Sequence, residues 1–242
     1  MRVAVVSDIH GNLHALEAVL AALETDRPDE LWCLGDLVGY GARPNECCSA
    51  IAARASFGLA GNHDLAVRGT IDLAEFSGDA GTAAAWTRTV LSDDARAYLD
   101  GVEPLGKRED VALFHASARD PVWEYVLSDE AALATLELTE ESIVLVGHSH
   151  VALHISLNDD VLAGGLSPGG TELDLRSGRW LLNPGSVGQP RDGDARAAYL
   201  LLDLEARTAS FRRTDYDVER TQQEIREAGL PEALAARLSA GI

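Results

Sequence analysis

The sequence predicts one compact α/β domain over residues 1–242 that contains two β-sheets. Up to residue 146, short apolar runs alternate with segments of helical periodicity, which indicates β-α-β units. After Gly147 the pattern changes to short strands separated by turns, which indicates a β-rich second half. No repeat, linker or low-complexity tract divides the chain, so all of it is assigned to one domain.

The first half begins with the apolar run Val3–Val6, which predicts a buried strand. Apolar residues then recur at helical spacing from Leu13 to Leu23, which predicts a helix over residues 12–24. Pro44 suits the first turn of a second helix, and Ser92 with two following aspartates marks a helix start within a helical stretch, 73–100. The other elements expected here are strands 31–34, 56–59, 111–115 and 143–146, and helices 44–54 and 128–136.

The second half is expected to hold strands separated by turn residues. These strands cover residues 153–157, 172–175, 179–182, 198–204 and 209–213. Two helices, 218–228 and 231–240, are expected to close the chain.

The chain carries a formal charge of −19, with 39 acidic and 20 basic residues. An acidic surface repels nucleic-acid backbones and anionic membranes, so we expect neither a nucleic-acid polymer nor a membrane as a partner. No apolar run approaches the ~20 residues that are needed to span a bilayer. The three cysteines form no Cys-x-x-Cys pair, which indicates reduced thiols and a cytoplasmic location.

Five short polar motifs follow predicted strands, where α/β proteins build their sites. They are Asp8-Ile9-His10, Gly35-Asp36, Gly61-Asn62-His63-Asp64, His115 and Gly147-His148-Ser149-His150. Residues two apart on an extended chain point the same way, so Asp8 and His10 are expected to reach one metal ion together. The same spacing separates His148 from His150.

The residue types in these motifs predict a metal centre. Carboxylates, an amide and imidazoles together suit Mn, Fe, Zn, Co or Ni, whereas Mg and Ca prefer oxygen ligands alone. Seven or more such ligands are too many for one ion, so we expect two divalent or trivalent transition-metal ions. Two ions ~3.5–4 Å apart share a bridging carboxylate and can clamp the attacking and leaving oxygens of a phosphate. With a bridging hydroxide such a site keeps a positive charge, which would attract a phosphate ester to an acidic protein.

In this order, the five motifs resemble the motif set of the calcineurin-like metallophosphoesterase superfamily. The flanking segments Gly39-Tyr40-Gly41 and Asn183–Arg191 resemble its small single-domain bacterial phosphodiesterase branch. The matched motifs extend from Asp8 to Arg191, which is most of the chain. The resemblance implies a four-layer α/β sandwich, in which two facing mixed sheets are flanked by helices. It also implies hydrolysis of a phosphate ester by a metal-bridging hydroxide.

The resemblance implies a role for each matched residue. The first metal ion would be held by Asp8, His10, Asp36 and His150. Asp36 would bridge to the second ion, which would be completed by Asn62, His115 and His148. Asn62 and His63 would contact the substrate. His63 would stabilise or protonate the leaving oxygen, with Asp64 orienting its ring.

Some neighbouring residues have open roles. Arg191 either contacts phosphate through its guanidinium fork or is solvated. Tyr40 either stacks on a base or sugar of the substrate or packs within its turn. The segment Arg119–Tyr125 is either a lid or specificity loop, or an aromatic patch over a core edge or a subunit contact. His14 and His154 are expected to be structural.

The predicted substrate is a small phosphate ester, and a diester such as a nucleotide derivative is favoured. A protein serine/threonine phosphatase is the first alternative, but those relatives carry Asp-Arg-Gly where this chain has Gly39-Tyr40-Gly41, and Glu where it has Asp64. A non-catalytic scaffold is the second alternative, but such relatives typically lack ligands, whereas none is missing here. The sequence leaves the natural substrate, the native metals and the oligomeric state open.

Overall fold

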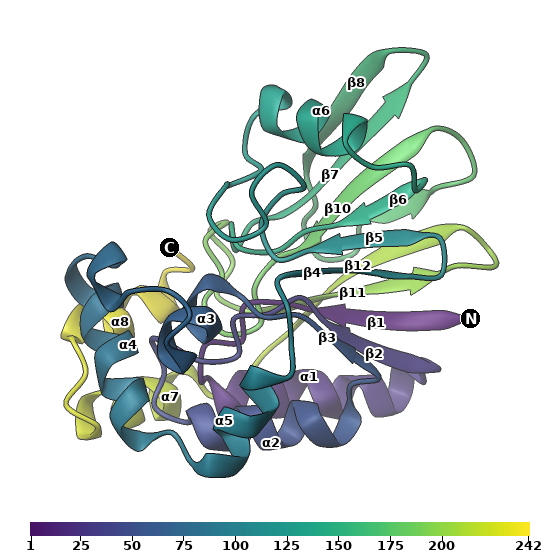
Figure 1. The fold of residues 1–242 in the computed structure, drawn as a ribbon. Helices are drawn as coiled ribbons and strands as arrows, with labels where there is room; N and C mark the ends of the chain where they lie inside the picture. Colours follow the sequence, from purple (N-terminus) through teal and green to yellow (C-terminus); the bar gives the residue numbers. More distant parts are fainter.

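The computed structural model describes residues 1–242 and contains two mixed six-stranded β-sheets, which are stacked on each other (Figure 1). In the order of hydrogen-bonded neighbours, the first sheet comprises β3 (Phe57–Gly58), β2 (Glu30–Cys33), β1 (Arg2–Val6), β11 (Ala197–Asp203), β12 (Thr208–Thr214) and β9 (Glu172–Asp174). The second sheet comprises β4 (Leu105–Arg108), β5 (Val111–Phe114), β6 (Ile143–Leu145), β10 (Arg179–Pro184), β7 (Ala152–Asn158) and β8 (Val161–Leu166).

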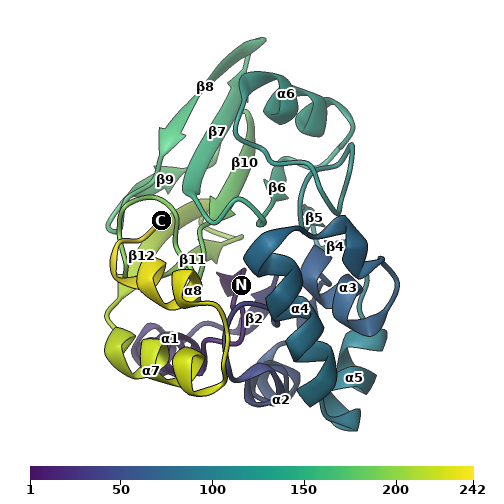
Figure 2. The ribbon, with the colours of Figure 1, turned by 90° about the vertical axis from the view of Figure 1, so that its left-hand side faces the viewer.

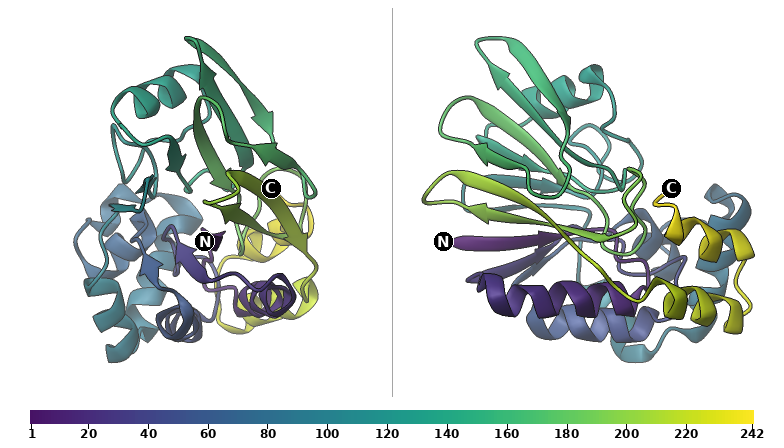
Figure 3. Two further views of the ribbon diagram at one scale, coloured as in Figure 1. Left: turned by 90° about the vertical axis from the view of Figure 1, so that its right-hand side faces the viewer. Right: turned by 180° about the vertical axis from the view of Figure 1, so that it is seen from behind.

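Helices cover the outer faces of both sheets (Figures 1 and 3). Along the first sheet lie α1 (Leu13–Asp26) and α2 (Pro44–Arg54), with α7 (Val218–Glu227) packed against α1 and α5 (Asp93–Asp100) packed against α2. The outer face of the second sheet carries α6 (Asp129–Glu137). The predicted four-layer α/β sandwich is therefore confirmed.

The remaining helices gather at the end of the sheets where the C-terminus lies, opposite the N-terminus (Figure 1). They are α3 (Asn62–Arg68), α4 (Gly78–Val90), α8 (Glu232–Ala236) and the 3-10 helices η1 (Leu73–Glu75) and η2 (Arg237–Ser239). Figure 2 looks onto this end, with α8 on one side and α4 on the other. The segments that leave the parallel strands β1, β2, β5 and β6 meet here, which places the polar motifs together. No helix has the length and apolar character that crossing a membrane requires.

Strand β1 shows how the layers are packed. Its side chains alternate in direction, so that Val3 and Val5 pack between the two sheets, in the same cluster as Trp32. Ala4 and Val6 pack on the other face, toward α1. All four strand residues are fully buried, and for this reason the strand reads as a continuous apolar run.

Three elements were not predicted from the sequence: α3, β4 and β8. Helix α3 begins directly after the strand expected at 56–59, with Gly61 as its N-cap and Asn62 as its first residue. Strands β4 and β8 lie at the two edges of the second sheet. Charged residues in β4 and adjacent glycines in β8 replace the apolar alternation by which a strand is recognised.

Candidate metal centre

The loops that carry the expected ligands have a strained backbone. Left-handed φ angles occur at Asp8 (54°), His10 (50°), Asp36 (53°), His148 (62°) and His150 (59°). A non-glycine residue in this region costs roughly 1–3 kcal/mol, and such residues cluster at functional sites. The expectation that Asp8 and His10 converge because their backbone is extended is therefore wrong. Tight left-handed turns after the strands aim these side chains instead.

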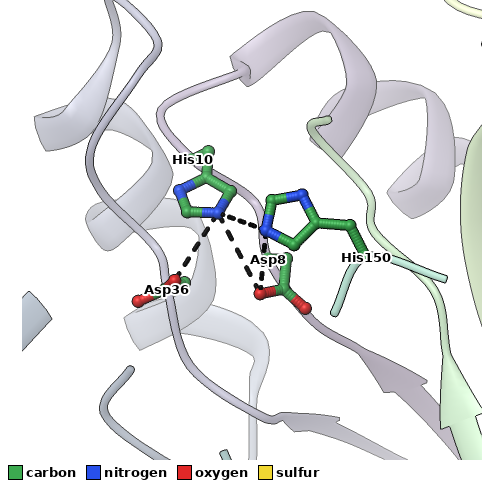
Figure 4. Close-up of side chains that lie close together, drawn as sticks. All are labelled: Asp8, His10, Asp36 and His150. Carbon is green, nitrogen blue, oxygen red and sulfur yellow. Dashed lines mark hydrogen bonds and ion pairs between the residues drawn. The ribbon is translucent and has the colours of Figure 1, made fainter. Parts of the chain in front are cut away.

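Four of the expected ligands form one buried group (Figure 4). The ligand atoms of Asp8, His10, Asp36 and His150 all lie within 4.8 Å of one another. His10 Nε2 lies 3.5 Å from Asp36 Oδ2, and His150 Nε2 lies 3.4 Å from Asp8 Oδ1. The first three residues follow strands of the first sheet, whereas His150 follows a strand of the second, so the group joins the two sheets.

A second group shares Asp36 with the first. Asp36, His115 and His148 place their ligand atoms within 4.8 Å of one another. His115 Nε2 lies 3.5 Å from Asp36 Oδ2, the same oxygen that faces His10, and 3.3 Å from Asn62 Oδ1. One carboxylate therefore lies between two sets of ligands, where a bridging residue is needed.

Each histidine of these groups contacts a backbone carbonyl through one ring nitrogen. Such a hydrogen bond orients the ring and leaves the other nitrogen free to bind a metal. The contacts join Nδ1 of His10 to Val38 O (3.0 Å), Nδ1 of His115 to Leu34 O (2.8 Å), Nδ1 of His150 to Gln189 O (2.6 Å) and Nε2 of His148 to Trp123 O (3.2 Å). His148 therefore offers Nδ1 to a metal, whereas the other three rings offer Nε2.

Several atoms of the first group have no favourable partner unless a cation lies among them. His10 Nε2 and His150 Nε2 are 3.0 Å apart. Because both rings donate Nδ1–H to carbonyls, two nitrogen lone pairs face each other across this distance. Asp8 Oδ1 is buried and accepts no hydrogen bond. A metal ion would satisfy all three atoms, so the residues present fit one.

Three of the four expected histidine ligands are neutral near pH 7, as metal ligation requires. Burial lowers the pKa of His10 and His150 well below its usual value and that of His148 to about 3, so these rings are neutral near pH 7. For His115, burial is outweighed by the neighbouring carboxylates, Asp36 first, which raise its pKa to about 9. Burial raises the pKa of Asp8 to about 7. It would also raise the pKa of Asp36, but the neighbouring histidines hold that pKa well below its usual value. Asp36 is thus the carboxylate that stays ionised between the two groups.

His63 lies beside the two groups. Its ring packs against Tyr40 (4.5 Å between centroids) and Phe76 (4.8 Å). Its Nδ1 is buried without a partner and faces Gly39, where φ is +85° and a side chain would collide with the ring. Burial lowers the pKa of His63 to about 4, so the ring is neutral near pH 7. Because an unpaired N–H is costlier to bury than a bare acceptor, we assign the proton to Nε2.

Asp64 does not orient the ring of His63, so this expected role is wrong. Its carboxylate accepts hydrogen bonds from the backbone N–H groups of Leu37 (2.9 Å), Val38 (3.1 Å) and Gly61 (2.9 Å). These bonds tie the loop after β2 to the N-terminus of α3. Asp64 therefore positions the loop that carries the shared carboxylate, while aromatic packing orients His63.

A cleft of about 220 Å³ opens above the ligands. We call the expected metal ligands its floor: Asp36, Asn62, His148 and His150, which line the cleft, together with Asp8, His10 and His115, which are buried beside them. We call the other side chains at its mouth its rim: Glu75, Phe76, Ser77, Ala80, Trp123 and Tyr125. Arg191 and Tyr40 also line the cleft, with the Arg191 guanidinium 5.8 Å above the Tyr40 ring.

The segment Arg119–Tyr125 contributes to the rim, so it lies at the cleft. The ring of Trp123 packs against Phe76 at 5.2 Å, which connects this segment to the one before α4. Tyr125 stacks on His148 at 4.1 Å with an interplanar angle of 12°. The rim residue Tyr125 therefore contacts the floor directly at His148, one of the expected metal ligands.

Further residues, to which the sequence analysis gave no role, hold the ligand loops in place. Asn183 donates hydrogen bonds to Gly147 O (2.7 Å) and Ser149 Oγ (3.0 Å), in the loop that carries two histidines. Ser186 donates to Asp8 O at 2.7 Å. Both belong to the Asn183–Arg191 segment, whose resemblance to the superfamily branch had already marked it in the sequence.

A buried ion pair supports the loop after β10. The side chains of Asp192 and Arg213 are 8% and 2% exposed. Asp192 Oδ2 also accepts from Ala152 N (3.2 Å), and Arg213 Nη1 donates to Asp194 O (3.2 Å). The pair ties this loop to the start of β7, which follows just after His148 and His150. Nothing in the sequence distinguishes these two charges from surface charges.

The two remaining histidines lie outside the metal centre, as predicted. His14 Nε2 lies 3.3 Å from a carboxylate oxygen of Glu224, in α7. His154 Nδ1 lies 2.8 Å from Ser167 Oγ. His154 thus contacts a hydroxyl and His14 faces a carboxylate, and neither contacts the metal-ligand groups.

The family model of the calcineurin-like phosphoesterase superfamily domain matches residues 1–207. The chain belongs to this superfamily. An uncharacterized protein of Methanocaldococcus jannaschii is 36% identical to it, over 99% of this chain and 98% of the relative. The crystal structure of a metallophosphoesterase from Sphaerobacter thermophilus is 39% identical over the whole of both chains, with a TM-score of 0.90. A hypothetical protein from Pyrococcus horikoshii shares the fold at 21% identity, with a TM-score of 0.82 over 100% of this chain and 98% of that one.

Membership of the calcineurin-like phosphoesterase superfamily confirms the resemblance inferred from the motifs. The chain is accordingly a phosphoesterase, and the family is metal-dependent. Its two buried Asp/His groups are positioned for a metal site.

Proposed function

We propose that this protein hydrolyses small phosphate esters, with diesters favoured, by using two transition-metal ions bound at the floor. Mn, Fe, Zn, Co and Ni suit its mixed oxygen and nitrogen ligands. The observation that carries the proposal is the position of Asp36, whose carboxylate belongs to both ligand groups. One site would be completed by Asp8, His10 and His150, and the other by Asn62, His115 and His148. Because these ligands come from both sheets, residues 1–242 would act as one catalytic domain.

When bound, the two ions would lower the pKa of the attacking water and neutralise charge on the phosphate. His63 would donate its Nε2–H to the leaving-group oxygen and stabilise the charge that develops there. Arg191, whose guanidinium is oriented by a hydrogen bond to Gln189 Oε1 (2.8 Å), would bind a phosphate group of the substrate at the edge of the cleft. Tyr40 lies against both Arg191 and His63, so it would position these two groups at the edge of the substrate.

Two features support a small ester rather than a phosphoprotein. The cleft is small, about 220 Å³, and the packed rings of Phe76 and Trp123 are part of its lining. Gly39 stands where protein phosphatases of the superfamily carry an aspartate, and a side chain at this position would collide with His63. In this loop conformation, a side chain at residue 39 would therefore displace the His63 ring.

The test is the hydrolysis of three substrates by metal-free protein to which each metal is added in turn. The substrates are bis(p-nitrophenyl) phosphate, p-nitrophenyl phosphate and a phosphoserine peptide. We expect metal-dependent release of p-nitrophenol, faster from the diester, and poor hydrolysis of the peptide. Similar kcat/KM values for the peptide and the small esters would favour a protein phosphatase. No hydrolysis with any metal would favour a non-catalytic scaffold.

A further inference from the structure

Two arginines share one acceptor beside the cleft. Gln189 Oε1 accepts hydrogen bonds from Arg191 Nη2 (2.8 Å) and from Arg237 Nη1 (3.3 Å). Arg191 lines the cleft, whereas Arg237 lies in η2, near the C-terminus and beyond residues 1–207, the part that the family model matches. The C-terminal segment therefore brings a second guanidinium next to the first.

Neither guanidinium is neutralised by a carboxylate side chain. The chain has 39 acidic and 20 basic residues, and most of its other arginines form side-chain ion pairs within 4.0 Å, but Arg191 forms none and the only carboxylate oxygen that Arg237 contacts is the carboxyl-terminal oxygen of Ile242. Arg237 Nε donates to Ile242 O (2.7 Å), which leaves its Nη2 without a partner. Arg191 Nε is buried and also unpartnered. In so acidic a protein, the unpaired charge of Arg191 and the donors left free on both guanidiniums favour an anion.

The two cations repel each other in the absence of an anion. Burial lowers the pKa of Arg237, and the charge of Arg191 lowers it further. Asp79 is the carboxylate that acts on Arg237 from α4, but it is exposed and forms no ion pair with it. An anionic ligand between the guanidiniums would remove this repulsion and use the donors that have no partner.

The positions of the pair relate it to the metal centre. Arg191 N donates to His150 O (3.1 Å), so its backbone is attached to a ligand loop. Its guanidinium lies over Tyr40, which lines the cleft together with His63. Arg237 reaches Arg191 through Gln189, to which both donate. Contacts thus run from the metal-ligand loop through Arg191 and Gln189 to Arg237.

We propose that Arg191 and Arg237 form a subsite for a second phosphate group of the substrate, beyond the ester that is cleaved. This inference rests on the proposed function, and it narrows the substrate to a phosphodiester with a further phosphate on the retained alcohol. The planar forks of two guanidiniums match phosphate oxygens in pairs, and the shared Gln189 holds them at a fixed spacing. Arg237 is then a specificity residue that takes no part in the cleavage of the ester.

The experiment compares two diesters with the same leaving group, thymidine 5′-(p-nitrophenyl phosphate) and its 3′-phosphorylated form. The wild-type metal-loaded protein should prefer the 3′-phosphorylated ester in kcat/KM by about tenfold or more, mainly through KM. In Arg237→Met this preference should fall to about twofold or less, while the ester without the 3′-phosphate is hydrolysed as before. Arg237→Lys should keep part of the preference, because it keeps the charge but loses the fork. Arg226→Met, which removes a surface-paired arginine of α7, is the matched control and should keep all of it.

A binding measurement accompanies the kinetics. Calorimetric Kd values for thymidine 3′,5′-bisphosphate and thymidine 5′-monophosphate should differ by about tenfold in the wild type, but not in Arg237→Met. A wild type that hydrolyses both esters without preference, or an Arg237→Met variant that retains the preference, would overturn the subsite alone. Equal losses on both esters in Arg237→Met and Arg237→Lys would also overturn it, because they would show a structural role. If the wild type hydrolyses neither ester with any metal, the proposed function itself fails.

Discussion

The floor and the rim of the cleft are built in different ways. Every floor side chain is almost completely buried, and each of its histidines is held by a backbone carbonyl. The rim is formed by two segments between strands, and its residues contact one another mainly by ring packing. Tyr125, for example, is 47% exposed. The groups that need exact mutual geometry thus lie on strand ends, whereas the groups that meet the rest of a substrate lie on segments that can vary without disturbing the fold.

This difference predicts that floor variants lose the reaction and that rim variants change its efficiency. The largest effect is expected for Asp36→Asn, which weakens the one carboxylate shared by both ligand groups. Its kcat for bis(p-nitrophenyl) phosphate should fall by at least ~10⁴-fold, or about 5 kcal/mol, because charge stabilisation by the metals is lost. Glu75→Gln removes a carboxylate at the rim and should change kcat by less than about threefold. Similar kcat values for the two variants would contradict the distinction between floor and rim.

Within the cleft, replacing His63 by Ala and replacing His148 by Ala should impair the enzyme in different ways, one through kcat and the other through metal binding. His63→Ala should keep both metals and lose roughly 10²–10⁴ in kcat, the usual effect of a placed acid–base group. The loss should shrink for esters with good leaving groups, since these need little stabilisation of the leaving oxygen. His148→Ala should bind the second metal more weakly and recover part of its activity at high metal concentration. Metal content and kcat across a leaving-group series test both, and rescue of His63→Ala by added metal would show that the roles are assigned wrongly.

Removing the ion pair between Asp192 and Arg213, which supports a ligand loop, should have a smaller effect than removing a floor ligand. Asp192→Ala leaves Arg213 buried without its partner, so it should lower the free energy of unfolding by about 3 kcal/mol. It should also weaken metal binding by roughly 10–100-fold, because the ion pair holds the loop next to His150. Asp194→Ala breaks an exposed ion pair in the same loop and should cost at most about 1 kcal/mol. Denaturant melts and Mn²⁺ titrations give both quantities; equal losses in the two variants would count against the support role.

The smallest effect is expected where the rim touches the floor. Tyr125→Leu removes the ring that stacks on His148, so it should weaken the second metal by about tenfold or less. Tyr125→Phe keeps the ring and should bind metal as the wild type does. Mn²⁺ titration of both variants is the measurement. If Phe weakens binding as much as Leu does, the stacking contact is not what matters at this position.

The sequence was informative where short local strings carry the information. Continuous apolar runs such as Val3–Val6 predicted the buried strands, and the polar residues that follow them are the ones that the fold brings together. The left-handed turns at Asp8 and His10 could not be predicted from the sequence, because glycine is the residue that indicates a positive φ angle and neither position has one. The role of Asp64 was missed for a related reason, since its partners are backbone N–H groups, which every residue has.

The rim and its surroundings were harder to predict because their contacts join distant parts of the chain. Phe76 and Trp123 meet across the mouth of the cleft, and Arg237 meets Arg191 through Gln189. No periodicity relates these positions, so the roles of Arg191 and of the Trp123 segment stayed open and none of these contacts could be predicted. The same holds for the pair formed by Asp192 and Arg213. Such contacts follow from the tertiary structure and not from local pattern.

The central claim is that Asp36 joins two metal sites, and metal stoichiometry tests it most directly. Protein freed of metal by a chelator and reconstituted with Mn²⁺ should bind two ions per chain in equilibrium dialysis, and Asp36→Asn should bind one or none. The thermal midpoint should rise with each ion bound, because the ions bind the folded state only. A ceiling of one ion per chain in the wild type at saturating Mn²⁺, Zn²⁺ and Fe²⁺ would contradict the account.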